Sequence, residues 1–166
     1  FDPDDLDTYP YPALDRQRKI AYVPLLTSRG CPFACKYCAS HFLNPERMMR
    51  SPESLAEEIK YWHKRFGVED FVFYDDALLV DEERHAIPIL ERIINSGLNI
   101  RFHTPNAVHI RGISRQTAQL MFRAGFETLR LGLETAAFDT REKLDKKVTA
   151  AEFERAVICL KEAGFH

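Results

Sequence analysis

Apolar stretches alternate with segments of helical periodicity along most of this chain, and this alternation restricts the fold more than any other feature. The strand candidates run Ile20 to Thr27, Asp70 to Tyr74, Leu98 to His103 and Glu127 to Leu133. A segment with apolar residues at helical spacing follows each of them. Four strand-helix units in a row predict an α/β fold with a parallel sheet and right-handed crossovers, either doubly wound or curled toward a barrel.

The four helical segments carry their own start and stop signals. Each begins at a residue that can cap a helix and ends at a glycine. These signals are Ser51 to Gly67, Asp81 to Gly97, Ser114 to Gly125 and Thr149 to Gly164. Pro88 lies well inside the second segment, so we expect either a kink or a helix that begins later than Asp81.

Polar residues come directly after each predicted strand. In parallel α/β folds the carboxyl ends of the strands meet at one edge, and ligands bind there. The residues in these positions are the cysteine-containing loop after the first strand, then Tyr74, Asp75 and Asp76, then His103, Thr104 and Asn106, and finally Glu134 and Thr135. The sequence therefore predicts a binding site at the carboxyl edge of the sheet.

Three cysteines, Cys31, Cys35 and Cys38, lie within eight residues in the run Cys-Pro-Phe-Ala-Cys-Lys-Tyr-Cys. Three thiolates on one loop can hold three corners of an iron-sulfur cube and leave its fourth iron open to a small molecule. The alternatives are a zinc site, which usually has four ligands, and a cluster of buried thiols. Cys159 does not complete a zinc site, because it lies far downstream on the inward face of a predicted helix, where a thiol acts as a small hydrophobe.

The fourth strand alternates between leucines and residues of other types. Leu129, Leu131 and Leu133 share one face, and this face is expected to meet the helices. The other face carries Arg130, Gly132 and Glu134 and is expected to point into a cleft or barrel toward a ligand. The alternative is a structural ion pair of Arg130 with Glu134 or with Asp75.

The spacing CxxxCxxC, with an aromatic residue before the last cysteine, resembles the signature of the radical S-adenosylmethionine (SAM) superfamily. The resemblance implies a partial, TIM-like (βα)6 barrel, of which this chain holds only about four βα units. It also implies that Cys31, Cys35 and Cys38 ligate a 4Fe-4S cluster whose fourth iron binds the amino and carboxylate groups of SAM. Tyr37 would lie near the adenine, or would pack under the loop.

One element of the family pattern is missing. The glycine-rich motif after the second strand, often Gly-Gly-Glu, is replaced here by Tyr74-Asp75-Asp76. We therefore expect Asp75 or Asp76 to hold the methionyl ammonium of SAM, the alternative being a helix cap or a solvated loop acid. Asn106 and His103 are expected near cofactor or substrate, or in a loop held by Asx-type hydrogen bonds.

Within the superfamily the chain is most similar to the group that carries a cobalamin-binding domain ahead of the barrel. The segments that carry this similarity are Leu6-Asp7-Thr8-Tyr9-Pro10-Tyr11-Pro12, Thr27-Ser28-Arg29-Gly30-Cys31-Pro32, Tyr74-Asp75-Asp76 and Leu131-Gly132-Leu133-Glu134-Thr135. Residues 1–19 are then expected to be a connector, and residues 20–166 the N-terminal part of a radical SAM core domain. Cobalamin stays open as a cofactor of the full-length protein, for methyl transfer or for rearrangement.

The resemblance implies an enzyme that cleaves SAM reductively to methionine and a 5′-deoxyadenosyl radical, which abstracts hydrogen from an unidentified substrate. An electron donor of low potential, of the flavodoxin or ferredoxin type, is the expected partner. Two other functions stay open. One is an iron-sulfur electron-transfer module, which would normally use four cysteines per cubane, and the other is a zinc-stabilised interaction domain.

Composition restricts partners and location. The 166 residues carry a formal charge of −2, which argues against a nucleic-acid surface. No run of about twenty apolar residues is present, so no membrane span is expected. Cysteines outside a disulfide pattern suggest a reducing cytoplasm. Missing barrel strands would leave a bare sheet edge, which predicts self-association of the isolated piece.

Overall fold

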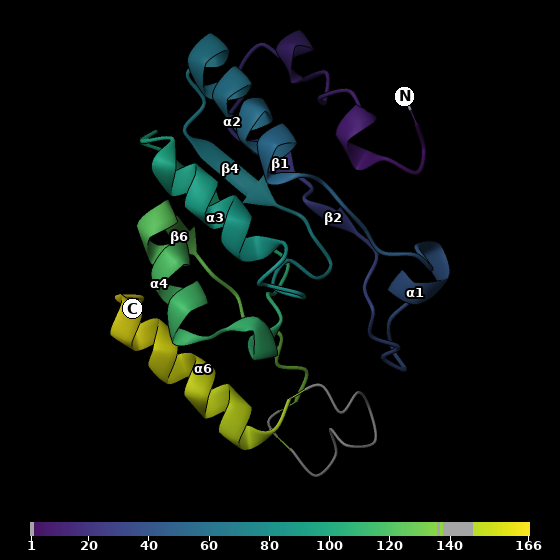
Figure 1. The fold of residues 1–166 in the computed structure, drawn as a ribbon, viewed down its shortest axis with the longest axis vertical. Coiled ribbons are helices and arrows are strands. Elements are labelled where there is room, and N and C mark those ends of the chain that lie inside the picture. Colours follow the sequence, from purple (N-terminus) through teal and green to yellow (C-terminus); the bar gives the residue numbers. More distant parts are fainter. Residues whose placement is uncertain (1, 136, 138–147) are drawn as a thin grey trace.

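The computed structural model describes residues 2–135, 137 and 148–166, and its central element is a parallel sheet of four strands (Figure 1). In sheet order the strands are β1 (Val23–Leu25), β4 (Asp70–Phe73), β5 (Arg101–His103) and β6 (Phe126–Thr128). All three strand pairs are parallel, and an isolated parallel bridge between Val108 and Leu131 continues the last of them. The predicted parallel α/β sheet is confirmed.

Four long helices lie side by side across one face of this sheet (Figure 1). They are α2 (Pro52–Phe66), α3 (Ala86–Asn95), α4 (Arg115–Ala124) and α6 (Ala150–Ala163). A doubly wound sheet would carry helices on both faces, whereas a barrel wall carries them on its outer face only. Of the two arrangements that the sequence left open, the structure has the barrel-like one.

Three of the four long helices, α2, α4 and α6, begin and end where the capping residues predict. Ser51 accepts a hydrogen bond from the Ser54 backbone N–H, and Gly67 ends α2 in the left-handed conformation. The capping box of Thr149 and Glu152 is present in α6. Helix α3 begins only at Ala86, which places Pro88 in its first turn, where the missing N–H costs no helical hydrogen bond. The expected later start is therefore confirmed.

The core lies between the sheet and the helices. Rings from three neighbouring strands stack in it, with centroids 5.3–5.9 Å apart: Phe71, Phe73, Phe102 and Phe126. Trp62 and Ile59 of α2 belong to this core. Cys159 is 8% exposed on α6 and belongs to the same core, which confirms its prediction as a small hydrophobe.

The strands are shorter than the apolar stretches that predict them. The first stretch leaves the sheet after Leu25, and directly after its end comes β2 (Ser28–Arg29), which pairs antiparallel with β3 (Met48–Met49). This two-stranded ribbon closes a loop that carries the three cysteines and the short helix α1 (Ser40–Leu43). Figure 1 shows α1 and β2 projecting beyond the arrowhead of β4, on the carboxyl side of the sheet.

The opening segment packs against the domain, which differs from the extended connector that its composition favours. It holds two single 3-10 turns, η1 (Leu6–Thr8) and η2 (Leu14–Arg16). Elsewhere in the chain, a third such turn, η3 (Ile110–Gly112), follows β5. Leu6 is only 4% exposed. Burial of this side chain and hydrogen bonds to α2 offset the entropy cost of ordering an acidic, proline-rich segment.

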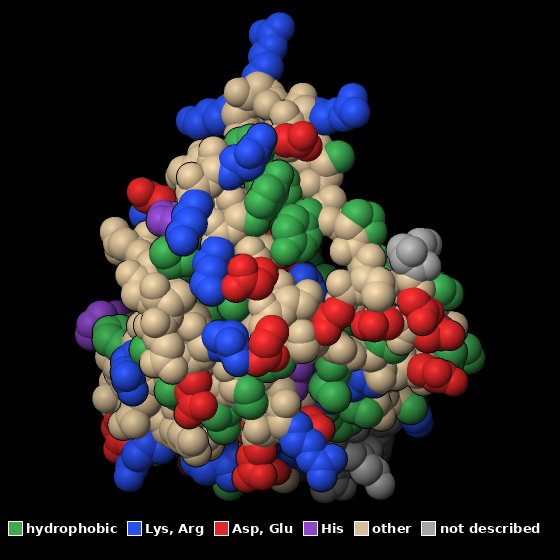
Figure 2. All heavy atoms as spheres, turned by 45° about the horizontal axis from the view of Figure 1, so that its top comes forward, with side chains coloured by type: hydrophobic (Ala, Val, Ile, Leu, Met, Phe, Trp, Pro, Cys, Tyr) green, Lys and Arg blue, Asp and Glu red, His purple; other side chains and the backbone are tan. Residues whose placement is uncertain are grey.

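The charged side chains follow no single-sign pattern over the face drawn in Figure 2. Acidic and basic groups are interspersed across its middle, and several Lys and Arg side chains stand at its top edge. Among the helices that the structure describes, none combines the length and the apolar character that crossing a membrane requires.

Candidate functional site

A cavity of about 390 Å³ lies at the carboxyl edge of the sheet, where the sequence predicts the site. Residues that follow every strand of the sheet line it: Cys31, Tyr37, Cys38, Asp76, Pro105, Asn106, Ala107, Val108, His109, Ile110, Gly132, Glu134 and Val148. Six of the nine site residues predicted from the sequence therefore share one cavity. Cys35, Asp75 and Arg130 are not among its lining residues.

Cys35 is buried and is not among the residues that line the cavity, unlike the other two cysteines. Its side chain is 3% exposed, and its carbonyl accepts a hydrogen bond of 3.0 Å from the Cys38 N–H. No group of three or more His, Cys, Asp or Glu side chains in the described ranges is gathered closely enough to hold a metal ion. A centre bound by all three thiols thus requires the loop tip to turn Cys35 toward the cavity.

The two arms of the cysteine loop meet tightly at Gly30. This residue has φ +85°, and a Cβ added to it would lie 2.6 Å from the Glu46 carbonyl oxygen and 3.3 Å from the Arg47 Cα. Only glycine meets both requirements, because a side chain is disfavoured at this φ and has no room. The departing and returning arms are thereby held in contact directly before Cys31.

Replacing Gly30 with alanine is expected to destabilise the protein more than the same change at Gly67. Both glycines have positive φ, but nothing lies within 4 Å of a Cβ at Gly67. Each change carries a backbone cost of about 1–2 kcal/mol, and overpacking at Gly30 adds about 1–3 kcal/mol. Urea unfolding of both variants measures the difference, and equal losses would mean that the contact with residues 46–47 relaxes freely.

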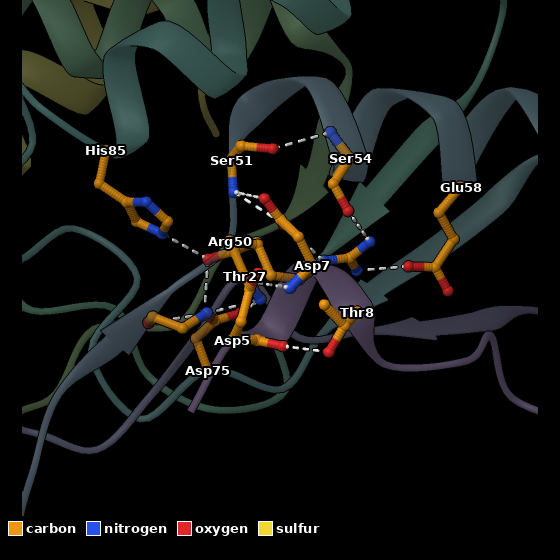
Figure 3. Close-up of polar contacts among 11 residues, drawn as sticks. Asp5, Asp7, Thr8, Thr27, Arg50, Ser51, Ser54, Glu58, Asp75 and His85 are labelled. Atoms are coloured by element: carbon orange, nitrogen blue, oxygen red, sulfur yellow. Dashed lines mark hydrogen bonds and ion pairs between the residues drawn. The ribbon is translucent and has the colours of Figure 1, made fainter. Parts of the chain in front are cut away.

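Asp75 is buried beneath the root of the cysteine loop and fixes it (Figure 3). Its Oδ1 accepts hydrogen bonds from the backbone N–H groups of Thr27 (3.0 Å) and Ser28 (2.6 Å) and from their hydroxyls (2.6 and 2.9 Å). These bonds draw residues 27–28 out of the β1 ladder. Burial raises the pKa of Asp75, against the opposing effect of these hydrogen bonds.

Of the two adjacent aspartates after β4, Asp76 is therefore the one that lines the cavity. The Thr27 hydroxyl donates its only proton to Asp75, so His85 Nε2, at 2.8 Å, must donate to the Thr27 oxygen. This assignment puts a proton on Nε2, and because burial lowers the pKa of His85 to about 4, the ring is neutral at pH 7. The network thus joins the α3 N-cap, the end of β1 and the end of β4.

Acid is expected to weaken the fold through His85. Burial, assisted by the nearby charge of Arg47, lowers the pKa of His85 from 6.5 to about 4. Between these values the unfolded chain binds the proton and the folded chain does not, so stability is full above pH 6.5 and falls as the pH drops toward 4. The loss is at most about 3 kcal/mol.

Urea unfolding at several pH values, compared with His85→Gln, measures this contribution. The glutamine keeps a donor for Thr27 but does not titrate, so its stability is expected to fall less across the same interval. A variant with the unchanged pH slope would show that other groups cause the acid sensitivity.

The predicted alternation along the fourth strand, with leucines toward the helices and the other residues toward a ligand, is confirmed in part. Leu129 and Leu131 pack against the core, whereas Gly132 and Glu134 line the cavity. Leu133 is 36% exposed, because the chain has left the sheet by this point. Arg130 is exposed and donates one long hydrogen bond of 3.4 Å to the Pro105 carbonyl. The Asp75 carboxylate, which was one expected partner of Arg130, is held by Thr27 and Ser28 instead.

The polar residues at the end of β5 and directly after it differ in whether they reach the cavity. Asn106 lines the cavity, and its side-chain amide donates to the Tyr74 carbonyl at 3.0 Å, which ties two strand ends together. His103 lies deeper, with Nε2 3.1 Å from Asp70 Oδ1 and Nδ1 3.0 Å from the Thr128 hydroxyl. Arg101 binds both Asp70 oxygens, and these contacts lower the pKa of Asp70 to about 2.

Sequence reasoning did not identify several residues that shape the site. His109 lines the cavity and stacks on Phe33 of the cysteine loop, with ring centroids 4.3 Å apart and planes 9° apart. His85 and the pair Thr27 and Ser28 were missed as partners of Asp75. No spacing in the sequence marks a buried aspartate that pairs with two hydroxyl residues. The one local signal was Gly30, directly before Cys31, which indicates a tight turn at the start of the cysteine loop.

The site and the fold together define a cysteine-loop enzyme domain built on part of an α/β barrel. Residues 25–166 match the family model of the Radical SAM superfamily, and the chain belongs to that superfamily. Its relatives are named as methyltransferases and cyclases, which makes the chain part of an enzyme.

Three similar proteins illustrate the range of this family. An uncharacterized methyltransferase of Pyrococcus horikoshii is 29% identical over 98% of this chain and 36% of its own length. The anaerobic magnesium-protoporphyrin IX monomethyl ester cyclase of Cereibacter sphaeroides is 28% identical over 82% of this chain and 22% of its own. The chain therefore spans about a third or less of the length of these relatives.

The third is a solved structure that shares the fold. The radical SAM methyltransferase TsrM from Kitasatospora setae, with cobalamin and a [4Fe-4S] cluster bound, superimposes with a TM-score of 0.72. The match covers 86% of this chain and 29% of TsrM at 19% sequence identity. This likeness confirms the barrel-type architecture.

Proposed function

We propose that this chain is the part of a radical SAM enzyme that binds a 4Fe-4S cluster through Cys31, Cys35 and Cys38 and holds SAM in the adjoining cavity. The observation that carries the proposal is the cavity itself, because two of the three thiols share it with residues from the end of every strand. A ligand there would meet sulfur, carboxylate, amide and aromatic groups at once.

The donor set suits an iron-sulfur cluster better than zinc. Three thiols on one loop match three irons of a cubane, whereas a structural zinc site takes four ligands, and this loop carries no fourth cysteine. Cys31 and Cys38 already line the cavity, and a turn of the loop tip brings Cys35 to it. When bound, the cluster supplies the electron for reductive cleavage of SAM. The protein's own residues position SAM and exclude water.

The cavity lining suggests how this chain holds SAM. Tyr37 is 48% exposed beside Cys38 and offers a ring on which the adenine can stack. We assign the methionyl ammonium to Asp76, since the Asp75 carboxylate is already used to fix the loop root. We assign Asn106 and Glu134, which line the cavity after β5 and β6, to accept hydrogen bonds from the ribose. Arg130 stays a candidate for binding the cofactor at the outer rim of the cavity.

The decisive experiment is anaerobic reconstitution of the purified protein with iron and sulfide. We expect close to four irons and four sulfides per chain, followed by SAM binding and release of 5′-deoxyadenosine when dithionite is added. Zinc in place of iron would indicate the interaction domain, and a cluster without SAM binding would indicate an electron-transfer module. SAM binding is the first measurement, because it does not require the parts of the enzyme that lie outside this chain.

Several properties of the whole enzyme follow as proposals. The relatives named as methyltransferases, and the cobalamin in TsrM, support cobalamin-dependent methyl transfer to a substrate still to be identified. Residues 1–19 would connect a preceding cobalamin-binding domain to a core that starts at residue 20. We further propose a cytoplasmic enzyme that takes electrons from a flavodoxin or ferredoxin. The strand edges at β1 and β6 would make this chain self-associate when isolated.

A further inference from the structure

The N-terminal strap, residues 5–11, lies across both arms of the cysteine loop at the point where they join the domain. In Figure 1 it runs beside the N-terminal end of α2, and Figure 3 shows its polar contacts with that end. The buried Leu6 anchors the strap. A cavity of about 150 Å³ lies between the strap and the domain, and Leu6, Tyr9 and Tyr11 line it together with Pro24, Arg29 and Glu58.

The outgoing arm is held through Arg29, which lies in β2 directly before Gly30 and Cys31. Its Nη1 donates to the Tyr9 hydroxyl at 3.3 Å, and its guanidinium lies 5.2 Å from the centroid of the Tyr9 ring. A single strap residue therefore makes a hydrogen bond and a cation-π contact with the same arginine.

The returning arm is held through Ser51, which follows β3 and caps α2. Its backbone N–H donates to both Asp7 oxygens, at 3.0 and 3.2 Å. The Arg50 Nε lies 3.9 Å from Asp7 Oδ1, while its guanidinium also binds Ser54 at 2.8 Å and the buried carboxylate of Glu58. Asp7 thus sits on a charged network that continues into α2.

We propose that Asp7 and Tyr9 are positioning residues for the cysteine loop. By holding Arg29 on one arm and Ser51 on the other, the strap fixes the distance between the two roots while the tip stays able to turn Cys35 outward. The alternative is a strap that only covers apolar surface, through Leu6 and through Tyr11, whose ring lies 5.4 Å from that of Tyr61. The inference rests on the proposed function only in naming the loop as the cluster loop.

The test is the rate at which iodoacetamide alkylates Cys35 in the metal-free protein, followed by peptide mass spectrometry. Cys35 is 3% exposed and reacts only when the loop opens, whereas Cys159, 8% exposed in α6, reports unfolding of the whole domain. For Asp7→Ala we expect Cys35 to react about tenfold faster, the order expected for loss of a charge-assisted hydrogen bond, with Cys159 unchanged. Tyr9→Phe, which keeps the ring over Arg29, is expected to give a smaller increase.

Tyr11→Ala is the matched control, because it removes the ring that contacts Tyr61 of α2 and keeps the strap's hydrogen bonds to Arg29 and Ser51. Under the positioning role it leaves the Cys35 rate within about twofold of wild type. A larger effect for Tyr11→Ala than for Asp7→Ala would overturn the proposal in favour of simple covering. So would an unchanged Cys35 rate in Asp7→Ala, or a parallel rise at Cys35 and Cys159. Because no iron is present, these outcomes are independent of whether the loop binds a cluster.

Discussion

Replacing Asp75 with alanine is expected to lower the free energy of unfolding by about 3–5 kcal/mol, because buried hydrogen-bond donors would lose their acceptor. The Thr27 and Ser28 backbone N–H groups would lose their shared acceptor and stay buried, since both residues are at most 1% exposed. Each unsatisfied buried donor costs about 1–3 kcal/mol, so two of them account for most of the effect. Urea unfolding at pH 7 measures the loss.

Asp76→Ala is the matched control on the neighbouring residue. This side chain is exposed and lines the cavity, so its removal is expected to change stability by less than about 0.5 kcal/mol. SAM binding to the reconstituted protein should instead weaken about tenfold, as expected for loss of an ion pair with the methionyl ammonium. The division of roles between the two aspartates would be wrong if Asp76→Ala destabilised the fold as much as Asp75→Ala.

The fold was largely predictable from the sequence because its signals are local. Apolar periodicity located the four strands of the sheet and their helices, and caps such as Ser51 and Thr149 set the helix starts within a residue or two. The choice between a doubly wound sheet and a barrel was not predictable from these signals. Strand twist and helix packing determine it, and both depend on contacts between distant elements.

The gathering of the site residues was predictable, but their individual orientations were not. Parallel strands bring their carboxyl ends to one edge, so Cys31, Asp76, Asn106 and Glu134 had to meet there. Which of two adjacent aspartates turns inward depends on donors 47 and 48 residues away, at Ser28 and Thr27. Periodicity carries no information about such partners.

The docking of the strap on the domain was also not predictable from the sequence. A segment rich in aspartate and proline lacks the apolar pattern of a packed element, and composition alone favours an extended connector. Its docking depends on Asp7 finding an exposed backbone N–H at Ser51 and on Tyr9 finding Arg29. Two polar contacts and one leucine decide the outcome, and none of them leaves a repeating pattern in the sequence.

Replacing Cys35 with alanine is expected to abolish cluster binding completely. Two thiolates from Cys31 and Cys38 cannot hold a cubane that needs three protein ligands to keep one iron open. After anaerobic reconstitution, iron and sulfide should fall to background, and SAM cleavage should be lost with them. Retained cleavage of SAM in this variant would contradict the assignment of the ligands.

Cys35 is the informative cysteine to replace, because the structure shows it buried like Cys159 and not in the cavity. If its role were only to fill the core, Cys35→Ala would behave like Cys159→Ala, which is expected to lose a little stability and keep a full complement of iron. If Cys35 turns outward to bind iron, the two variants differ completely in iron content while their unfolding curves in the metal-free state stay similar. The comparison therefore tests the predicted movement of the loop tip as well as the ligand set, and it separates both from a general effect on folding.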